Sequence, residues 1–122
     1  MMKEGYEELV KAICRPPRAQ YTIADLGPSE FNFGGVPFVR EDSQVTNKRG
    51  FTLECSFWRR QQLPEGGAPC VIYMHGNASC RAEAIQILAP VFATGANVFS
   101  FDFAGCGLST GDYISLVRPR PR

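Results

Sequence analysis

The sequence predicts an α/β fold that forms the N-terminal part of a mixed sheet, an antiparallel hairpin followed by a β-α-β unit. Two apolar runs, Val71–Met74 and Val98–Phe103, flank a segment with helical periodicity. Runs this apolar are typical of strands covered on both faces, and a strand, a helix and a strand in series make a parallel pair. Upstream, Phe38–Arg59 contains two alternating segments around the turn sequence Asn47–Gly50, which predicts the antiparallel hairpin.

Composition indicates one modest globular domain. The chain has 122 residues, of which 44% are hydrophobic and 20% charged, and a net charge of +1. A charge this small gives no general attraction to nucleic acid or to anionic lipid, and no apolar run is long enough to span a bilayer. The acidic N-terminus does not resemble a signal peptide. Five cysteines, an odd number without paired spacing, predict free thiols and a cytoplasmic location.

We divide the chain into three parts. Residues 1–28 hold a helix over 3–14 and a proline-rich lead-in, residues 29–116 form a partial α/β domain, and residues 117–122 are an Arg/Pro tail. The helix has an apolar stripe that includes Tyr6 and Leu9. Its acidic residues favour packing on the body of the protein over binding to a membrane surface. Pro16-Pro17 should end it.

A second helix is predicted between the two apolar runs. Ser79 is a suitable N-cap, and Glu83 lies one residue too far along for a capping box. Pro90 should kink or end the helix near Ala89, and Gly95 suits its C-terminal cap. The predicted buried face is the following: Ile85, Leu88, Ala89 and Phe92, widened by Ala84, Ile87 and Val91.

Two loops follow the predicted parallel strands, His75–Ser79 and Ala104–Gly111. Ligands and chemistry in such sheets lie at the carboxyl ends of the strands. The first loop contains His75-Gly76-Asn77, and the second completes the sequence Asp102-Phe103-Ala104-Gly105-Cys106-Gly107-Leu108-Ser109. These loops are therefore the candidate site.

Together the two loop sequences resemble those of the α/β-hydrolase superfamily, in particular its serine aminopeptidase-like and acyl-thioesterase-like branch. The lead-in Arg15–Tyr21 is similar to that of some eukaryotic members, and the resemblance extends from about residue 15 to 116. It implies hydrolysis of an ester, thioester or amide through an acyl-enzyme, with a small-molecule or peptide acyl substrate. In that family the hairpin supplies the first two strands, Val71–Met74 would be the third and Val98–Phe103 the fourth. The resemblance implies that the fourth strand lies between the second and the third.

The resemblance assigns the oxyanion-stabilising role to the backbone N–H of Asn77. Such a donor is effective because it is already aimed at the oxygen on which charge develops. His75, Gly76 and Ala78 would shape this loop, and Gly76 has no side chain to block the approach. Considered alone, the first loop could merely turn the chain. The resemblance gives the following residues of the second loop a shaping role without catalysis: Gly105, Gly107 and Ser109.

The catalytic machinery is missing from the pattern. Gly107–Gly111 matches Gly-x-Ser-x-Gly, but three residues separate it from the preceding strand and no convincing helix follows, unlike a nucleophile elbow. The sequence contains one histidine, His75, which precedes Ser109 instead of following it as a triad base would. The nucleophile elbow, the acid and the base are thus absent. The sequence is interpreted as an N-terminal fragment of a serine hydrolase, inactive alone, with a C-terminal complement of the same fold as a possible partner.

Alternatives remain open at this point. The chain could be a non-catalytic interaction module, or a small esterase using Ser109. A Cys106–His75 dyad is a weaker candidate. We expect no metal, because the cysteines lack ligand spacing. We also expect no dinucleotide cofactor, because the glycine pattern would need glycine at Thr110.

Overall fold

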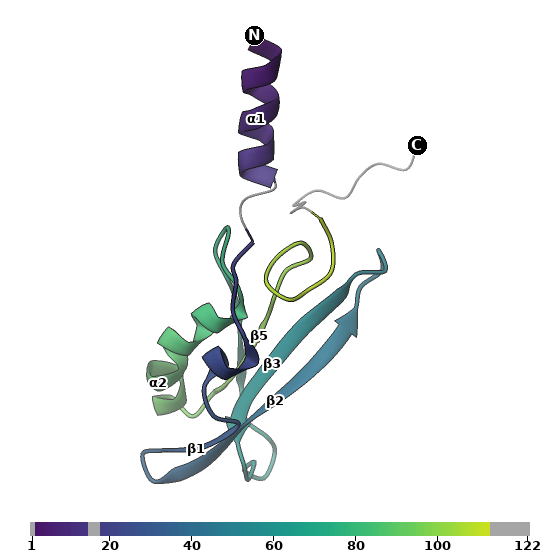
Figure 1. The fold of residues 1–122 in the computed structure, drawn as a ribbon. Helices are drawn as coiled ribbons and strands as arrows, with labels where there is room; N and C mark the ends of the chain where they lie inside the picture. The colour runs from purple at the N-terminus through teal and green to yellow at the C-terminus, as the bar shows by residue number, and fades with distance from the viewer. Residues whose placement is uncertain (1, 15–17, 113–122) are drawn as a thin grey trace.

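The computed structural model describes residues 2–14 and 18–112, and its ribbon is drawn in Figure 1. The elements are α1 (Met2–Cys14), η1 (Ile23–Leu26), β1 (Glu30–Phe33), β2 (Val36–Thr46), β3 (Thr52–Arg60), β4 (Cys70–Met74), η2 (Arg81–Ala84), α2 (Ile85–Ala93) and β5 (Asn97–Phe101). The helices η1 and η2 are single 3₁₀ turns. The predicted tail, residues 117–122, and Pro16-Pro17 lie outside the described residues.

The described strands form one five-stranded sheet in the order β1-β2-β3-β5-β4. β2 and β3 pair antiparallel from Phe38 opposite Arg60 to Thr46 opposite Thr52, which confirms the hairpin. β4 and β5 pair in parallel, and β5 lies between β3 and β4. The predicted β-α-β unit and the order implied by the resemblance are therefore confirmed.

A tight turn at Gly34-Gly35 connects β1 to β2. Both glycines have positive φ, +57° and +78°, and Phe33 pairs with Val36. A two-residue turn with both residues in the left-handed conformation matches the twist of the flanking strands. Glycine adopts this conformation without a Cβ clash. The turn brings Phe31 and Phe33 of β1 against Phe38 of β2, so the short edge strand contributes to the core.

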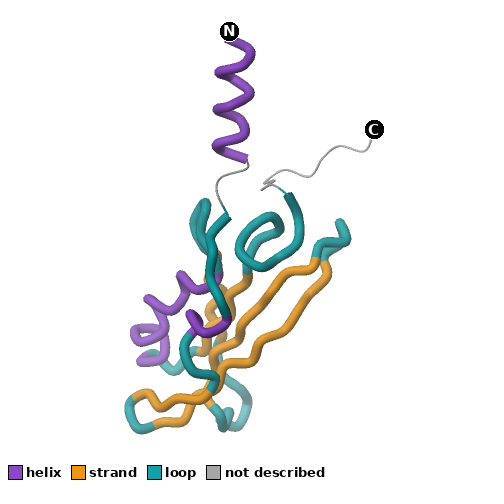
Figure 2. The backbone as a smooth tube through the Cα atoms, viewed as in Figure 1, coloured by secondary structure: helices purple, strands orange, loops and turns teal. Residues whose placement is uncertain are grey.

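The core lies between the sheet and the layer that contains α2 and η1, on one side of the strands in Figure 2. Its most buried members are Leu26, Phe38, Trp58, Ala84, Phe92 and Val98. Phe38 and Phe92 stack with ring centroids 4.2 Å apart, which joins β2 to α2. Trp58 is 1% exposed and comes from the middle of β3. Side chains of a strand alternate between faces, so Trp58 reaches this core from the face of β3 that it shares with Ser56.

The second helix differs from its prediction in two ways. The 3₁₀ turn η2, capped by Cys80, precedes α2, so Ser79 is not the N-cap. Pro90 lies inside α2, which continues to Ala93. Pro90 is exposed, so the carbonyl that loses its partner four residues earlier can be hydrated and the helix need not end. The buried stripe uses Ala84 and Phe92, whereas Ile85 and Ala89 are exposed.

One edge of the sheet and part of its second face are uncovered. In β4, Val71, Ile72 and Met74 are 39%, 62% and 63% exposed. These side chains point to both faces, since successive residues of a strand alternate. β4 therefore presents an apolar edge with unpaired backbone groups.

The helix α1 forms as predicted, but its packing prediction is wrong for the residues whose side chains are described. Residues 3–9 are exposed, with Tyr6 at 68% and Leu9 at 58%, and α1 stands apart from the sheet in Figure 1. In the described part of the chain, no helix has the length and apolar character needed to cross a bilayer.

Candidate functional site

The loop after β4 begins with a tight turn over Gly76–Ser79. The Ser79 N–H donates to the Gly76 carbonyl over 3.2 Å. Ala78 has φ +58° and is the one non-glycine residue with positive φ in the described chain. A type II turn requires positive φ at this third position, which usually holds glycine. A left-handed alanine costs about 1–2 kcal/mol, and strain of this kind concentrates at functional loops.

His75 links this loop to the loop after β5. Its side chain is 5% exposed. Nε2 accepts the Phe103 N–H over 3.0 Å, and Nδ1 lies 2.8 Å from the Gly76 carbonyl oxygen. A carbonyl oxygen only accepts, so Nδ1 carries the proton and the ring is neutral. Both ring nitrogens are thereby committed to backbone groups, and neither can act as a base toward a serine.

The same contacts orient the N–H of Asn77. The Gly76 carbonyl receives two donors, His75 Nδ1 and Ser79 N. In a trans peptide the N–H points away from the carbonyl, so fixing that oxygen also fixes the Asn77 N–H. Asn77 is exposed, and no described residue accepts its N–H. The loop thus presents a fixed, free donor to the solvent.

Glu83 of η2 anchors the loop from the other side. Its Oε2 accepts the Gly76 N–H over 2.9 Å and the Tyr73 hydroxyl over 2.8 Å. The Gly76 N–H, followed by smaller contributions that include Tyr73, lowers the pKa of the Glu83 carboxyl. The hydrogen bond between the Tyr73 hydroxyl and the Glu83 carboxylate raises the pKa of Tyr73. A charged carboxylate therefore holds the peptide that precedes the candidate donor.

The loop after β5 is organised around Asp102, which is fully buried. Its carboxylate accepts the Tyr21 hydroxyl at 2.5 Å, the Arg81 N–H at 2.7 Å and the Leu108 N–H at 2.9 Å. Burial, and then the bond to Asp102, raises the pKa of Tyr21. Three segments distant in sequence therefore meet at one carboxylate, which positions them beside the strand ends.

Ser109 is buried within this loop at 1% exposure. Its Oγ donates to the Asp102 carbonyl over 2.7 Å and accepts the Glu54 N–H over 2.9 Å. Both hydrogen bonds are to backbone groups, and the side chain is closed to solvent. The Gly107–Gly111 sequence match is consequently not a nucleophile elbow, because an elbow presents its hydroxyl at the surface of the site.

Glycine and arginine complete this loop. Gly107 has φ +50°, and a Cβ built there would lie 2.5 Å from the Asp102 carboxyl carbon. Arg18 donates from Nη1 to the carbonyls of Gly107 and Ser109, at 3.2 and 2.7 Å, and from Nη2 to that of Gly111. The lead-in therefore spans the loop and satisfies its carbonyl groups.

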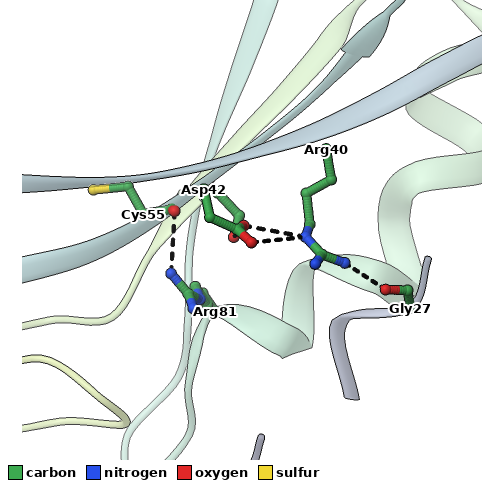
Figure 3. Close-up of polar contacts among 6 residues, drawn as sticks. Gly27, Arg40, Asp42, Cys55 and Arg81 are labelled. Atoms are coloured by element: carbon green, nitrogen blue, oxygen red, sulfur yellow. Dashed lines mark hydrogen bonds and ion pairs between the residues drawn. The ribbon is translucent and has the colours of Figure 1, made fainter. Parts of the chain in front are cut away.

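A buried polar layer lies behind the two loops, and Figure 3 shows its arginines. Arg40 pairs with Asp42 at 3.1 Å and donates to the Gly27 carbonyl at 2.5 Å. Arg81 is fully buried and donates from Nη1 to the Cys55 carbonyl at 3.1 Å. Its guanidinium carbon lies 5.7 Å from the centre of the Tyr21 ring. The Arg81 contact holds the start of η2 against β3, and the Arg40 contact joins β2 to the end of η1.

The Cys106–His75 dyad considered from the sequence does not form. Cys106 is 3% exposed, and burial raises the pKa of its thiol, which opposes thiolate formation. Its proposed partner His75 uses both ring nitrogens elsewhere. Within residues 2–14 and 18–112, no group of three or more His, Cys, Asp or Glu side chains is arranged to hold a metal ion.

The structure brings the two predicted loops together and adds residues that the sequence analysis did not assign to the site. Arg18 and Tyr21 belong to the lead-in Arg15–Tyr21, which is similar to that of some α/β-hydrolases. That similarity was the signal that could have placed them at the site. Glu83 was considered only for a capping box. Arg81 carried no signal, because a buried arginine is unusual in a globular core.

Comparisons with solved structures find proteins of similar fold. An esterase of Pyrococcus furiosus, solved in two crystal forms, superposes with TM-scores of 0.57 and 0.56 at 27% and 25% identity. The match covers 83% of this chain and 34% and 35% of the esterase chains. Acetyl xylan esterase 1 of a Thermoanaerobacterium species matches with a TM-score of 0.51 at 21% identity, over 75% of this chain and 27% of that one.

The chain therefore has the α/β-hydrolase fold, in the portion that runs from the hairpin to the second parallel strand. It spans about a third of the length of the Pyrococcus esterase. No protein-family model matches the chain, and no curated protein sequence matches it.

Proposed function

We propose that this chain supplies the oxyanion-loop part of a serine α/β-hydrolase. The reaction is hydrolysis of an ester, thioester or amide through an acyl-enzyme, with a small-molecule or peptide acyl substrate, as in the aminopeptidase-like and thioesterase-like branch. The observation that carries the proposal is the Asn77 N–H, exposed at the end of β4 and held in direction through the Gly76 carbonyl. The two structural neighbours named as esterases support it.

The chemistry follows from where charge develops. Attack on an acyl carbon moves a negative charge to the former carbonyl oxygen, and a fixed N–H stabilises that oxyanion without reorganising. The Gly76 N–H is already occupied by Glu83 and the Ser79 N–H by the Gly76 carbonyl, whereas the Asn77 N–H, to which the resemblance assigns the role, has no acceptor among the described residues. Gly76 and Ala78 keep the turn compact, and His75 keeps its peptide aligned.

The remaining catalytic groups would come from a C-terminal complement of the same fold. Ser109 is enclosed, and the sequence holds no second histidine. A serine without a neighbouring base is a weak nucleophile. The 122 residues alone are therefore proposed to be inactive, and the free thiols of the described cysteines suit a reducing compartment such as the cytoplasm.

A chimaera tests the oxyanion role. Residues 70–111 replace the matching segment of the Pyrococcus esterase, and Asn77 is changed to Pro or to Ala. Proline suits the second position of a type II turn, so Asn77→Pro deletes the N–H and keeps the turn, whereas Asn77→Ala keeps both. Loss of one such donor costs about 10²–10³-fold in kcat. Equal kcat values for the two variants would refute the role of Asn77.

The small-esterase alternative has a direct test on the 122-residue chain. We expect no covalent labelling by a fluorophosphonate probe, because the Ser109 hydroxyl is buried between two backbone groups. Labelling that disappears in Ser109→Ala would replace the present proposal with the small esterase.

The interaction-module alternative is favoured by the exposed edge of β4. Ile72 and Met74 are more than half exposed there, and an apolar edge strand readily accepts another strand. We expect the 122-residue chain to self-associate in sedimentation experiments and Ile72→Lys/Met74→Lys to be monomeric. A wild-type chain that stays monomeric and binds no complementary hydrolase segment would remove the support for this surface.

A further inference from the structure

Glu83 contacts the candidate oxyanion loop from outside the loop sequence. One carboxylate oxygen, Oε2, receives both the Gly76 N–H and the Tyr73 hydroxyl, at 2.9 and 2.8 Å. Tyr73 belongs to β4 and Glu83 to η2. The carboxylate thus connects the loop to the strand before it and to the helical turn after it.

The two peptide groups on either side of the Gly76 Cα are held by different residues. The peptide between His75 and Gly76 is held at its N–H by Glu83. The next peptide is held at its carbonyl by His75 and Ser79. Both restraints are needed, because glycine has the widest backbone freedom of any residue.

Steric contacts do not restrain Gly76 in place of these hydrogen bonds. A Cβ built at Gly76 would meet Glu83 Oε1 at 3.6 Å, an ordinary van der Waals separation. Gly76, Asn77 and Ala78 are all exposed. The direction of the Asn77 N–H therefore depends on hydrogen bonds, and Glu83 makes the one that is charged.

We propose that Glu83 is a positioning residue for the oxyanion donor, holding the Gly76 peptide so that the Asn77 N–H keeps its direction. This inference rests on the proposed function. Glu83 acts through Gly76 and does not itself donate to the oxyanion. The titratable groups that face it are Tyr73, which is bonded to it, and His75.

Amide exchange and chemical shifts of the 122-residue chain, followed by NMR, test the contact. In Glu83→Ala we expect exchange of the Gly76 amide to accelerate about tenfold to hundredfold, the range expected for loss of a charge-assisted hydrogen bond. Glu83→Gln keeps an acceptor oxygen and should stay within about threefold of wild type. Tyr73→Phe is the matched control, since it removes the other bond to Oε2 and leaves that of Gly76.

A pH titration separates positioning from general stabilisation. The Gly76 amide shift should change with protonation of Glu83, at a pH below the ordinary range for glutamate because the pKa of Glu83 is lowered. The shift should be flat over that range in Glu83→Gln. Unchanged Gly76 exchange in Glu83→Ala would overturn the proposal. Acceleration spread evenly over the sheet amides would also overturn it, because that result indicates only global destabilisation.

The chimaera distinguishes this inference from the proposed function. There Glu83→Ala should lower kcat with little change in KM, since the donor acts mainly in the transition state. If Asn77→Pro leaves kcat unchanged, the proposed function fails whatever Glu83 does. If Asn77→Pro lowers kcat and Glu83→Ala does not, Glu83 alone is refuted. The NMR measurements are repeated in the Ile72→Lys/Met74→Lys chain, so that association at β4 cannot hide the loop signals.

Discussion

The loops after β4 and β5 lie side by side, joined by the hydrogen bond from the Phe103 N–H to His75, yet they are built in opposite ways. The β4 loop exposes three consecutive residues, Gly76, Asn77 and Ala78. The β5 loop buries Gly107 and Ser109 around the carboxylate of Asp102. The exposed β4 loop can present a backbone donor because the buried β5 loop, through Phe103, helps to hold His75.

Substitution of Gly107 should be the most damaging change in the β5 loop. We expect Gly107→Ala to lower the free energy of unfolding by about 3–5 kcal/mol, because left-handed strain adds to disruption of the hydrogen bonds of Asp102. The new Cβ would lie 2.5 Å from the Asp102 carboxyl carbon. Urea denaturation measures the change. Gly95→Ala is the control, with φ +89° and no atom within 4 Å, and should cost only about 1–2 kcal/mol. Similar losses in the two variants would contradict the close packing on Asp102.

A smaller effect is expected at Ser109. Ser109→Ala leaves the Glu54 N–H and the Asp102 carbonyl without their partner, which should cost about 1–3 kcal/mol. Thr110 also accepts a backbone N–H, that of Thr52 at 2.8 Å, but it is exposed. Thr110→Ala should therefore cost less than about 1 kcal/mol, because water replaces the lost group. If thermal unfolding finds Thr110→Ala the more damaging, the β5 loop is not held by its buried side.

The smallest effect has the opposite sign and concerns the exposed loop. Ala78→Gly should raise the free energy of unfolding by about 0.5–1 kcal/mol, because relief of the positive φ exceeds the added entropy of the unfolded chain. Ala89→Gly, at an exposed interior position of α2, is the control and should lower stability by about 1 kcal/mol. Both are measured by urea denaturation. A loss of stability in Ala78→Gly would show that the turn stores no strain.

The periodic parts of the fold could be predicted from the sequence. The positions of β3, β4 and β5 follow from the alternation and the apolar runs in the residues. The expected coverage of β4 on both faces was wrong, because Val71, Ile72 and Met74 are exposed. The start of α2 could not be predicted in this way, because Ser79 is a good N-cap by type but lies in a turn that β4 and Glu83 impose. Pro90 was expected to kink or end the helix; it does not end α2, because on an exposed helix face water can bind the carbonyl that loses its partner.

The candidate site also contains residues that the sequence could predict and residues that it could not. The sequence gives His75 and Asn77 through their motif, and the missing base and spacing already argued against Ser109 as a nucleophile. The contacts of Arg18, Tyr21 and Glu83 depend on tertiary structure. Arg18 reaches carbonyls about ninety positions away, and no local pattern records a contact at that separation. Glu83 reaches Gly76 because η2 replaces the first turn of the predicted helix.

Arg18 also bears on the order of events when the protein is made. Its partners, Gly107, Ser109 and Gly111, are 89, 91 and 93 positions downstream. A ribosome synthesises the chain from its N-terminus, so the guanidinium emerges well before the carbonyls that it will bind. The hydrogen bonds of Arg18 can therefore form only after β5 is complete, and a nascent chain stalled before Gly107 would lack them.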